Sequence, residues 1–268
     1  MPDREKVVRH IKAEIEIAKL CKKDFASVDI DMLSDAYELL KEQEAVISVL
    51  TGKGERMKTL IAIPCFDMVH TDFTKSFVDL IKPPGTSYTM VKNTLVYDAR
   101  NIVAANAIEA GFDRVFWMDS DMSFPKDALV RLSEAMDEGR EMVSGLYFTR
   151  RMPNIKPVVY KKMWYEVKPD GSIDTGADNY FDYPEGVIEC EAAGFGCMLT
   201  SVDLIKRVSD RFGSPFTPLE CMGEDMAFCM RVRMLGEKVY CDTRVKCGHF
   251  ASVEITEETY RSLHPIAL

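Results

Sequence analysis

The sequence lacks the patterns that place a chain in a membrane, on a polyanion or in a disulfide framework. No stretch of the 268 residues is apolar for long enough to cross a bilayer, and the start, "MPDREKVVRHIKAEIEIAKL", alternates charged and apolar residues, unlike a signal peptide. The net charge of −9 disfavours nonspecific binding to nucleic acid. The eight cysteines form no CxxC pair, and most lie among apolar residues, as reduced thiols do. We therefore expect a cytoplasmic protein with no membrane span.

Hydrophobic spacing divides the chain near residue 55. Apolar residues recur at helical spacing over residues 4–22 and 32–50, which predicts a helical hairpin. The following "TGKGERMK" combines two glycines with charged residues and indicates a linker. We expect a hairpin and linker over residues 1–55, a means of self-association or of docking, and a main domain over residues 56–268.

From Thr59 onward, short apolar runs alternate with helical segments, which is typical of an α/β fold with a mixed, mainly parallel sheet and flanking helices. Strands are predicted at residues 59–64, 87–91, 114–118 and 141–147, and helices at 71–81, 94–110, 126–138, 202–209 and 224–235. Residues 150–185 are rich in proline, glycine and aromatic residues, which predicts loops with an antiparallel excursion. Strand character resumes in "GVIECEAAGFGCMLTS".

Two carboxylates come directly after the predicted strand in "RVFWMDSDMSFP". Ligands of open α/β sheets bind outside the carboxyl ends of the strands, where Asp119 and Asp121 would lie. Like charges so close repel each other, and a hard cation between them would remove that repulsion and neutralise a diphosphate. The alternative is a solvated turn in which Asp121 caps the next helix.

Two later segments add groups of the same chemistry. Glu224 and Asp225 begin a predicted helix, where the helix dipole favours negative charge, and His249 in "VKCGHF" comes after a strand-like run. Each has a plainer interpretation, namely an acidic first turn and a structural histidine.

The chain resembles the GT-A glycosyltransferases, especially the family 2-like members, in the order of six segments. These are "IAIPCFD", "DARN", "WMDSDMSFP", "GFGCMLT", "GEDMAFCMRVRMLGEKVYCD" and "CGHF". The resemblance covers about residues 58–250. It implies transfer of a sugar from a nucleotide-diphosphate sugar, with a UDP-sugar as the expected donor. It also implies a Mn²⁺ or Mg²⁺ ion on the diphosphate, with Asp119, Asp121 and His249 as the metal site.

The resemblance further implies a donor site. Its residues would be Pro64, Phe66, Asp67, Arg100, Asp119, Ser120, Arg150, Gly194, Phe195 and Gly196. Some of these have structural interpretations that stay open: packing for Phe66, a surface ion pair for Arg100, a turn into a core strand for the glycines, and an exposed loop for Arg150.

An inverting transfer needs a base for the acceptor hydroxyl, and Asp225 matches that base by resemblance, with Glu224 orienting the acceptor or a loop. A retaining mechanism stays open. So do a nucleotidyltransferase, although "IPCFDMVHTD" has no Gly-rich basic phosphate loop, and a noncatalytic nucleotide-sugar-binding module. The acceptor is open among a glycan, a small molecule and a modified DNA base.

Overall fold

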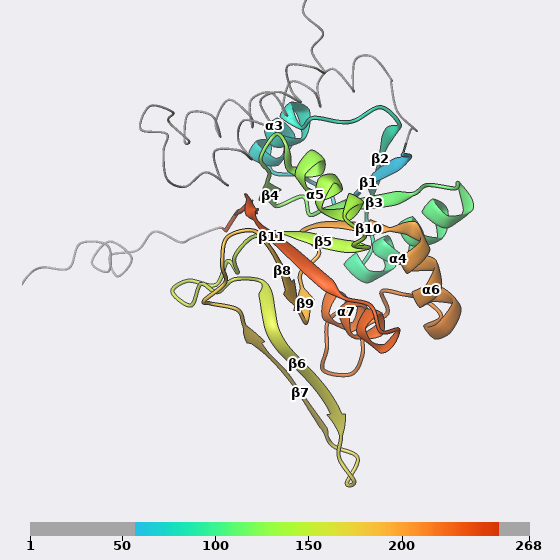
Figure 1. Cartoon of the computed structure of the whole chain (residues 1–268), viewed down its shortest axis with the longest axis vertical. Helices are drawn as coiled ribbons and strands as arrows, with labels where there is room; N and C mark the ends of the chain where they lie inside the picture. The colour runs from blue at the N-terminus through green and yellow to red at the C-terminus, as the bar shows by residue number, and fades with distance from the viewer. Residues whose placement is uncertain (1–56, 252–268) are drawn as a thin grey trace, which may run out of the picture.

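A computed structural model describes residues 57–251. The hairpin and linker predicted for residues 1–55 therefore lie outside the described residues, and the predicted domain boundary stays a prediction. Element labels are those of Figure 1.

A seven-stranded sheet forms the centre of the described domain (Figure 1). Its strands, in spatial order, are β2 (Thr86–Val91), β1 (Thr59–Pro64), β3 (Arg114–Met118), β10 (Cys197–Ser201), β5 (Met142–Leu146), β11 (Val239–Lys246) and β8 (Val187–Cys190). The pairings make β2, β1, β3, β5 and β11 run in one direction, and β10 and β8 in the other. The predicted fold class, a mixed and mainly parallel α/β sheet with flanking helices, is confirmed.

Both faces of the sheet are covered, because alternate residues of its central strands are apolar on both sides. In β1, Leu60 and Ala62 belong to one buried cluster, and Ile61 and Ile63 belong to the other. The helices that contribute to the first cluster are α4 (Val96–Glu109), α6 (Val202–Phe212) and α7 (Glu224–Met234), and those that contribute to the second are α3 (Thr71–Asp79) and α5 (Ala128–Asp137). A strand buried on both sides reads as a continuous apolar run, which is why "TLIAIP" and "RVFWM" were recognisable.

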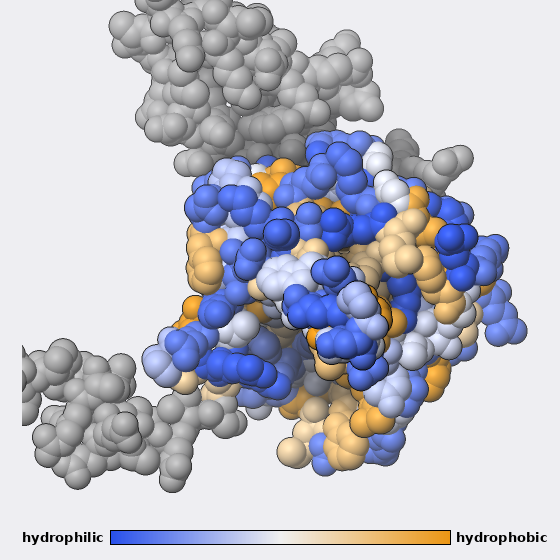
Figure 2. All heavy atoms as spheres, turned by 90° about the horizontal axis from the view of Figure 1, so that it is seen from below, coloured by the Kyte–Doolittle hydropathy of each residue, from blue (hydrophilic) through white to orange (hydrophobic). Residues whose placement is uncertain are grey.

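Two smaller sheets flank the central one. The strands β6 (Val159–Val167) and β7 (Ile173–Asn179) form an antiparallel hairpin that projects from the body of the domain, and β6 also pairs with β9 (Ala192–Ala193) (Figure 1). This hairpin is the antiparallel excursion expected within residues 150–185. Figure 2 views the molecule from below and shows hydrophilic side chains over most of that face, with hydrophobic patches between them.

The second small sheet pairs β4 (Met122–Ser123) with β12 (Gly248–His249). It joins the segment after β3 to the segment after β11, although more than a hundred residues separate them in the sequence. It thus brings the carboxylates after β3 and the late histidine into one neighbourhood.

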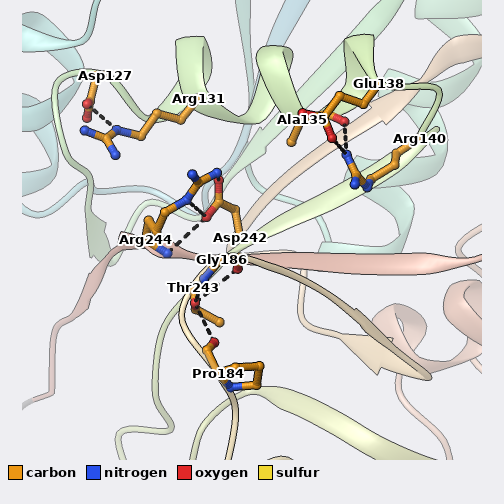
Figure 3. A network of polar contacts seen from close by, with 10 residues as sticks. All are labelled: Asp127, Arg131, Ala135, Glu138, Arg140, Pro184, Gly186, Asp242, Thr243 and Arg244. Atoms are coloured by element: carbon orange, nitrogen blue, oxygen red, sulfur yellow. Dashed lines mark hydrogen bonds and ion pairs between the residues drawn. The ribbon is translucent and has the colours of Figure 1, made fainter. Parts of the chain in front are cut away.

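Polar contacts fix the strand that leads to β12. In β11 the fully buried Asp242 accepts hydrogen bonds from the guanidinium of Arg244 at 2.9 and 2.8 Å (Figure 3). The hydroxyl of Thr243 donates to the carbonyl oxygen of Pro184 at 2.9 Å and accepts from the amide of Gly186 at 2.9 Å. The two bonds of Thr243 hold the residues that precede β8 against β11.

Within residues 57–251, no helix combines the length and the apolar character that a membrane span requires. All the cysteines in this part of the chain are free thiols, and all of them except Cys221 are buried. Cys21 lies outside the described residues.

Candidate functional site

A pocket of about 430 Å³ opens at the carboxyl ends of β1 and β3. Because parallel neighbours end at the same edge of a sheet, the residues after them meet there. The pocket is lined by Pro64, Cys65, Phe66, Thr94, Leu95, Val96, Asp119, Ser120, Asp121 and Arg150. Six of the predicted donor and metal residues are therefore brought together, namely Pro64, Phe66, Asp119, Ser120, Asp121 and Arg150.

One wall of this pocket is apolar. Phe66 is 68% exposed and Leu95 is 59% exposed, and Val96 lies beside Leu95 at the start of α4. Large apolar side chains left in water at a pocket mouth offer a surface for a flat ring. Sequence reasoning missed Thr94, Leu95 and Val96. The available signal was the entry of the predicted helix at residue 94, directly after a strand that neighbours β1.

The segment after β11 places an imidazole beside the second carboxylate. His249 lies opposite Met122 in the β4–β12 pair, and the amide of Phe250 donates to the backbone carbonyl of Asp121 at 2.8 Å. His249 Nδ1 lies 2.8 Å from the carbonyl oxygen of Phe148, and its Nε2 lies 3.6 Å from Asp121 Oδ2. A carbonyl only accepts, so Nδ1 carries a proton and Nε2 is the nitrogen that faces Asp121.

A cationic side chain is also in contact with Asp121, since the guanidinium of Arg150 forms an ion pair with its carboxylate. Burial acts to raise the pKa of Asp121, but the polar contact with His249 and the charge of Arg150 together hold that pKa below its usual value. The same contact with Asp121 raises the pKa of His249. Asp121 is thus an ionised carboxylate that attracts positive charge.

The donor chemistry of Asp121 and His249 fits a divalent cation, because an oxygen and an imidazole nitrogen suit Mn²⁺. Arg150 already places a positive group at this carboxylate, as a stand-in for such an ion. Within the described range, however, no group of three or more His, Cys, Asp or Glu side chains is arranged to hold a metal ion. The third predicted ligand, Asp119, is directed elsewhere: its Oδ1 accepts a hydrogen bond from Arg100 Nη2 at 2.8 Å.

Arg100 does not line the pocket, and the ion pair that it forms with Asp119 is not one of two surface side chains. It projects from α4, its side chain is 3% exposed, and its guanidinium carbon lies 5.1 Å from the centre of the Phe195 ring. Its Nε lies 3.7 Å from Glu224 Oε1. Burial raises the pKa values of Asp119 and Glu224, and the charge of Arg100 opposes that rise in both.

The first turn of α7 brings Asp225 to the same region. Its cap is Gly223, which supplies no side-chain hydrogen bond, and Asp225 Oδ1 accepts from the amide of Met226 at 2.7 Å. The negative charge of Asp225 acts on both Asp119 and Tyr147. Asp225 is half-buried and does not line the pocket itself.

Tyr147, which comes directly after β5, is a buried member of the site that sequence reasoning did not find. Its Oη accepts a hydrogen bond from the amide of Gly196 at 3.2 Å, and its ring meets that of His249 edge to face at 5.6 Å. Burial, with the charges of Asp119 and Asp225, raises its pKa well above the usual value. Only the fold reveals this residue, because the sequence shows just an aromatic at the end of an apolar run.

Three further residues predicted for the donor site, Gly194, Phe195 and Gly196, are packed against protein side chains. A Cβ on Gly194 would lie 2.0 Å from Tyr147 Oη, and one on Gly196 would lie 2.3 Å from Met122 Sδ. These glycines make room for protein side chains. Phe195 is buried in an aromatic cluster with Trp117, Phe216 and Phe228, so its ring does not face the pocket.

Asp67 is exposed and does not line the pocket. The backbone of the glycine segment stays close to the carboxylates, since the amide of Asp119 donates to the carbonyl oxygen of Gly196 at 3.0 Å.

Neither a protein-family model nor a curated protein sequence matches the chain. Among solved structures, it is similar to A197 from STIV, with a TM-score of 0.54 and 19% identity over 73% of this chain and 87% of that chain. A weaker similarity, with a TM-score of 0.49 and 9% identity, is to GalNAc-T7 with UDP, GalNAc and Mn²⁺, and it covers 74% of this chain and 44% of that one. The similarity to A197 supports a shared α/β fold.

Proposed function

We propose that the chain is a metal-dependent glycosyltransferase that moves a sugar from a nucleotide-diphosphate sugar, with UDP as the expected nucleotide, to an acceptor hydroxyl. The observation that carries the proposal is the pocket at the ends of β1 and β3. There, an apolar wall adjoins an ionised carboxylate, Asp121, and an arginine, and the imidazole of His249 lies 3.6 Å from that carboxylate. A ring, a diphosphate and a cation would each meet a suitable surface within one small space.

In this proposal the nucleobase lies against Phe66 and Leu95, because both present exposed apolar surface. The ribose meets Asp119 or Ser120, which line the same pocket. The diphosphate lies towards Asp121 and Arg150, where Arg150 exchanges its ion pair with Asp121 for phosphate oxygens.

Asp121 and His249 would hold the Mn²⁺ or Mg²⁺ ion beside the diphosphate. When bound, the cation stabilises the charge that develops on the departing nucleoside diphosphate. His249 is suited to this role because its Nδ1–H is committed to the carbonyl of Phe148, which fixes the ring and aims Nε2 at Asp121.

Asp225 acts as the general base of an inverting transfer and takes the proton of the acceptor hydroxyl as that oxygen attacks the anomeric carbon. Both residues are half-buried, but Glu224 faces the buried Arg100 at 3.7 Å, whereas the negative charge of Asp225 acts on the donor carboxylate Asp119. This difference favours Asp225 as the base and Glu224 as the residue that orients the turn.

A thermal-shift panel tests the proposal. The full chain is heated with UDP-, GDP-, ADP- and CMP-linked sugars in Mn²⁺ and, separately, in excess EDTA. A ligand that binds only the folded state raises Tm by mass action, so a Mn²⁺-dependent rise with a UDP-sugar is expected. Slow hydrolysis of that sugar should accompany binding, and the anomeric configuration of the released sugar then distinguishes inversion from retention. No rise with any nucleotide sugar in Mn²⁺ would contradict the proposal.

A further inference from the structure

Arg100 is a buried cation that faces two carboxylates from two different parts of the site. Asp119 comes after β3 on the donor side, and Glu224 begins α7, the helix that carries Asp225. Arg100 Nη2 is hydrogen-bonded to Asp119 at 2.8 Å, and Arg100 Nε stands 3.7 Å from Glu224. The aromatic ring of Phe195, at 5.1 Å, limits where the guanidinium can move.

The hydrogen bonding of this guanidinium is incomplete. In the described part of the chain, Arg100 Nε and Nη1 are buried without a hydrogen-bond partner. A buried charged donor without a partner is costly, and a guanidinium has the fork geometry to bond two carboxylates at once. The Nε–Glu224 separation of 3.7 Å exceeds a hydrogen bond by only a few tenths of an ångström. A small inward movement of the first turn of α7 would complete the fork.

We propose that Arg100 is a positioning residue that couples the donor carboxylate Asp119 to the first turn of α7. The coupling rests on the proposed function, because Asp119 is taken to meet the donor. Donor binding at Asp119 draws the turn that begins with Glu224 inward, and the Arg100–Glu224 hydrogen bond forms. Asp225, the next residue in that turn, is thereby set in place only when a donor is bound. Arg100 touches no reacting atom.

The test compares Arg100→Gln and Arg100→Lys with the wild type. Arg114→Gln is the matched control, since Arg114 is also a buried arginine and forms an ion pair with Asp137 at 2.5 Å. Arg114 lies at the opposite end of β3 from Asp119. UDP affinity in saturating Mn²⁺ is measured by calorimetry. Hydrogen exchange of the amides of residues 224–228 is measured with and without UDP and Mn²⁺.

We expect UDP and Mn²⁺ to slow exchange in the first turn of α7 in the wild type and in Arg114→Gln, but not in Arg100→Gln. UDP affinity of Arg100→Gln should fall about 10- to 100-fold, the size of a lost hydrogen bond to a charged group. Arg100→Lys should recover part of the affinity and none of the protection, because one ammonium cannot serve both carboxylates in fork geometry.

If the wild type does not bind UDP with Mn²⁺, the proposed function fails, and the coupling fails with it. If the wild type binds UDP and Arg100→Gln binds within about twofold with the same protection of α7, the coupling alone is wrong. If Arg100→Gln does not fold, the same hydrogen-exchange measurement is made on Glu224→Gln. Loss of the slower exchange that UDP and Mn²⁺ cause in α7 supports the coupling, and its retention overturns the coupling.

Discussion

Removing the arginine that contacts Asp121 should change Mn²⁺ binding and UDP binding in opposite directions. Arg150 is 53% exposed and Asp121 is 35% exposed in their side chains, so their ion pair belongs with solvent-exposed pairs, which contribute about 0.2–1 kcal/mol. Arg150→Ala removes this competing cation, and Mn²⁺ alone should bind about 2- to 5-fold more tightly. UDP in saturating Mn²⁺ should bind about 10- to 100-fold more weakly, because the diphosphate loses a charge-assisted hydrogen bond.

The assay is calorimetric titration of Mn²⁺ without UDP, and of UDP with Mn²⁺ in excess. Arg151→Ala is the control, since it removes the same charge from the neighbouring exposed residue, which does not line the pocket. A general effect of charge would appear equally in both variants. The reasoning is refuted if Arg150→Ala weakens Mn²⁺ binding, or if its UDP affinity equals that of the wild type.

Three further changes have defined outcomes. Asp225→Asn should leave UDP affinity in Mn²⁺ within about twofold while hydrolysis or transfer of the donor falls about 10²- to 10⁴-fold; Asp203→Asn, in the first turn of α6, serves as control. Gly194→Ala should lower the free energy of unfolding by about 1–3 kcal/mol in urea titration, because its Cβ would overlap Tyr147 Oη, and Tyr147→Phe in the same chain should restore part of the loss. Deletion of residues 1–52 should preserve Mn²⁺-dependent UDP binding by calorimetry, since the pocket is lined by later residues.

The sheet and the position of the first two carboxylates were predictable because they depend on local patterns. Strands buried on both faces, such as β1 and β3, are continuous apolar runs, and the residues at their carboxyl ends must lie at one edge of the sheet. The insertion of β10 between β3 and β5, antiparallel to both, was not predictable. It depends on pairing between residues far apart in the sequence, and it brings the carbonyl oxygen of Gly196 within hydrogen-bond distance of the amide of Asp119.

The positions and contacts of individual site residues were not predictable, because they depend on tertiary packing. Arg100 and Glu224 are far apart in sequence, and nothing local indicates that Arg100 turns inward from α4 towards Asp119. His249 reaches Asp121 only through the short β4–β12 pair, whose two-residue strands have no recognisable pattern. The glycines of "GFG" were expected at the donor site, but a Cβ on either of them would meet Tyr147 or Met122, so they make room for protein side chains.

Electron–nuclear double resonance of Mn²⁺ bound to the full chain with UDP tests the central claim most directly. If Asp121 and His249 hold the cation on the diphosphate, one Mn²⁺ ion will show coupling to ³¹P of UDP and to ¹⁴N of an imidazole. In His249→Ala the nitrogen coupling should vanish while the phosphorus coupling remains. Mn²⁺ that couples to phosphorus alone in the wild type, or a nitrogen coupling that persists in His249→Ala, would contradict a metal site made by Asp121 and His249.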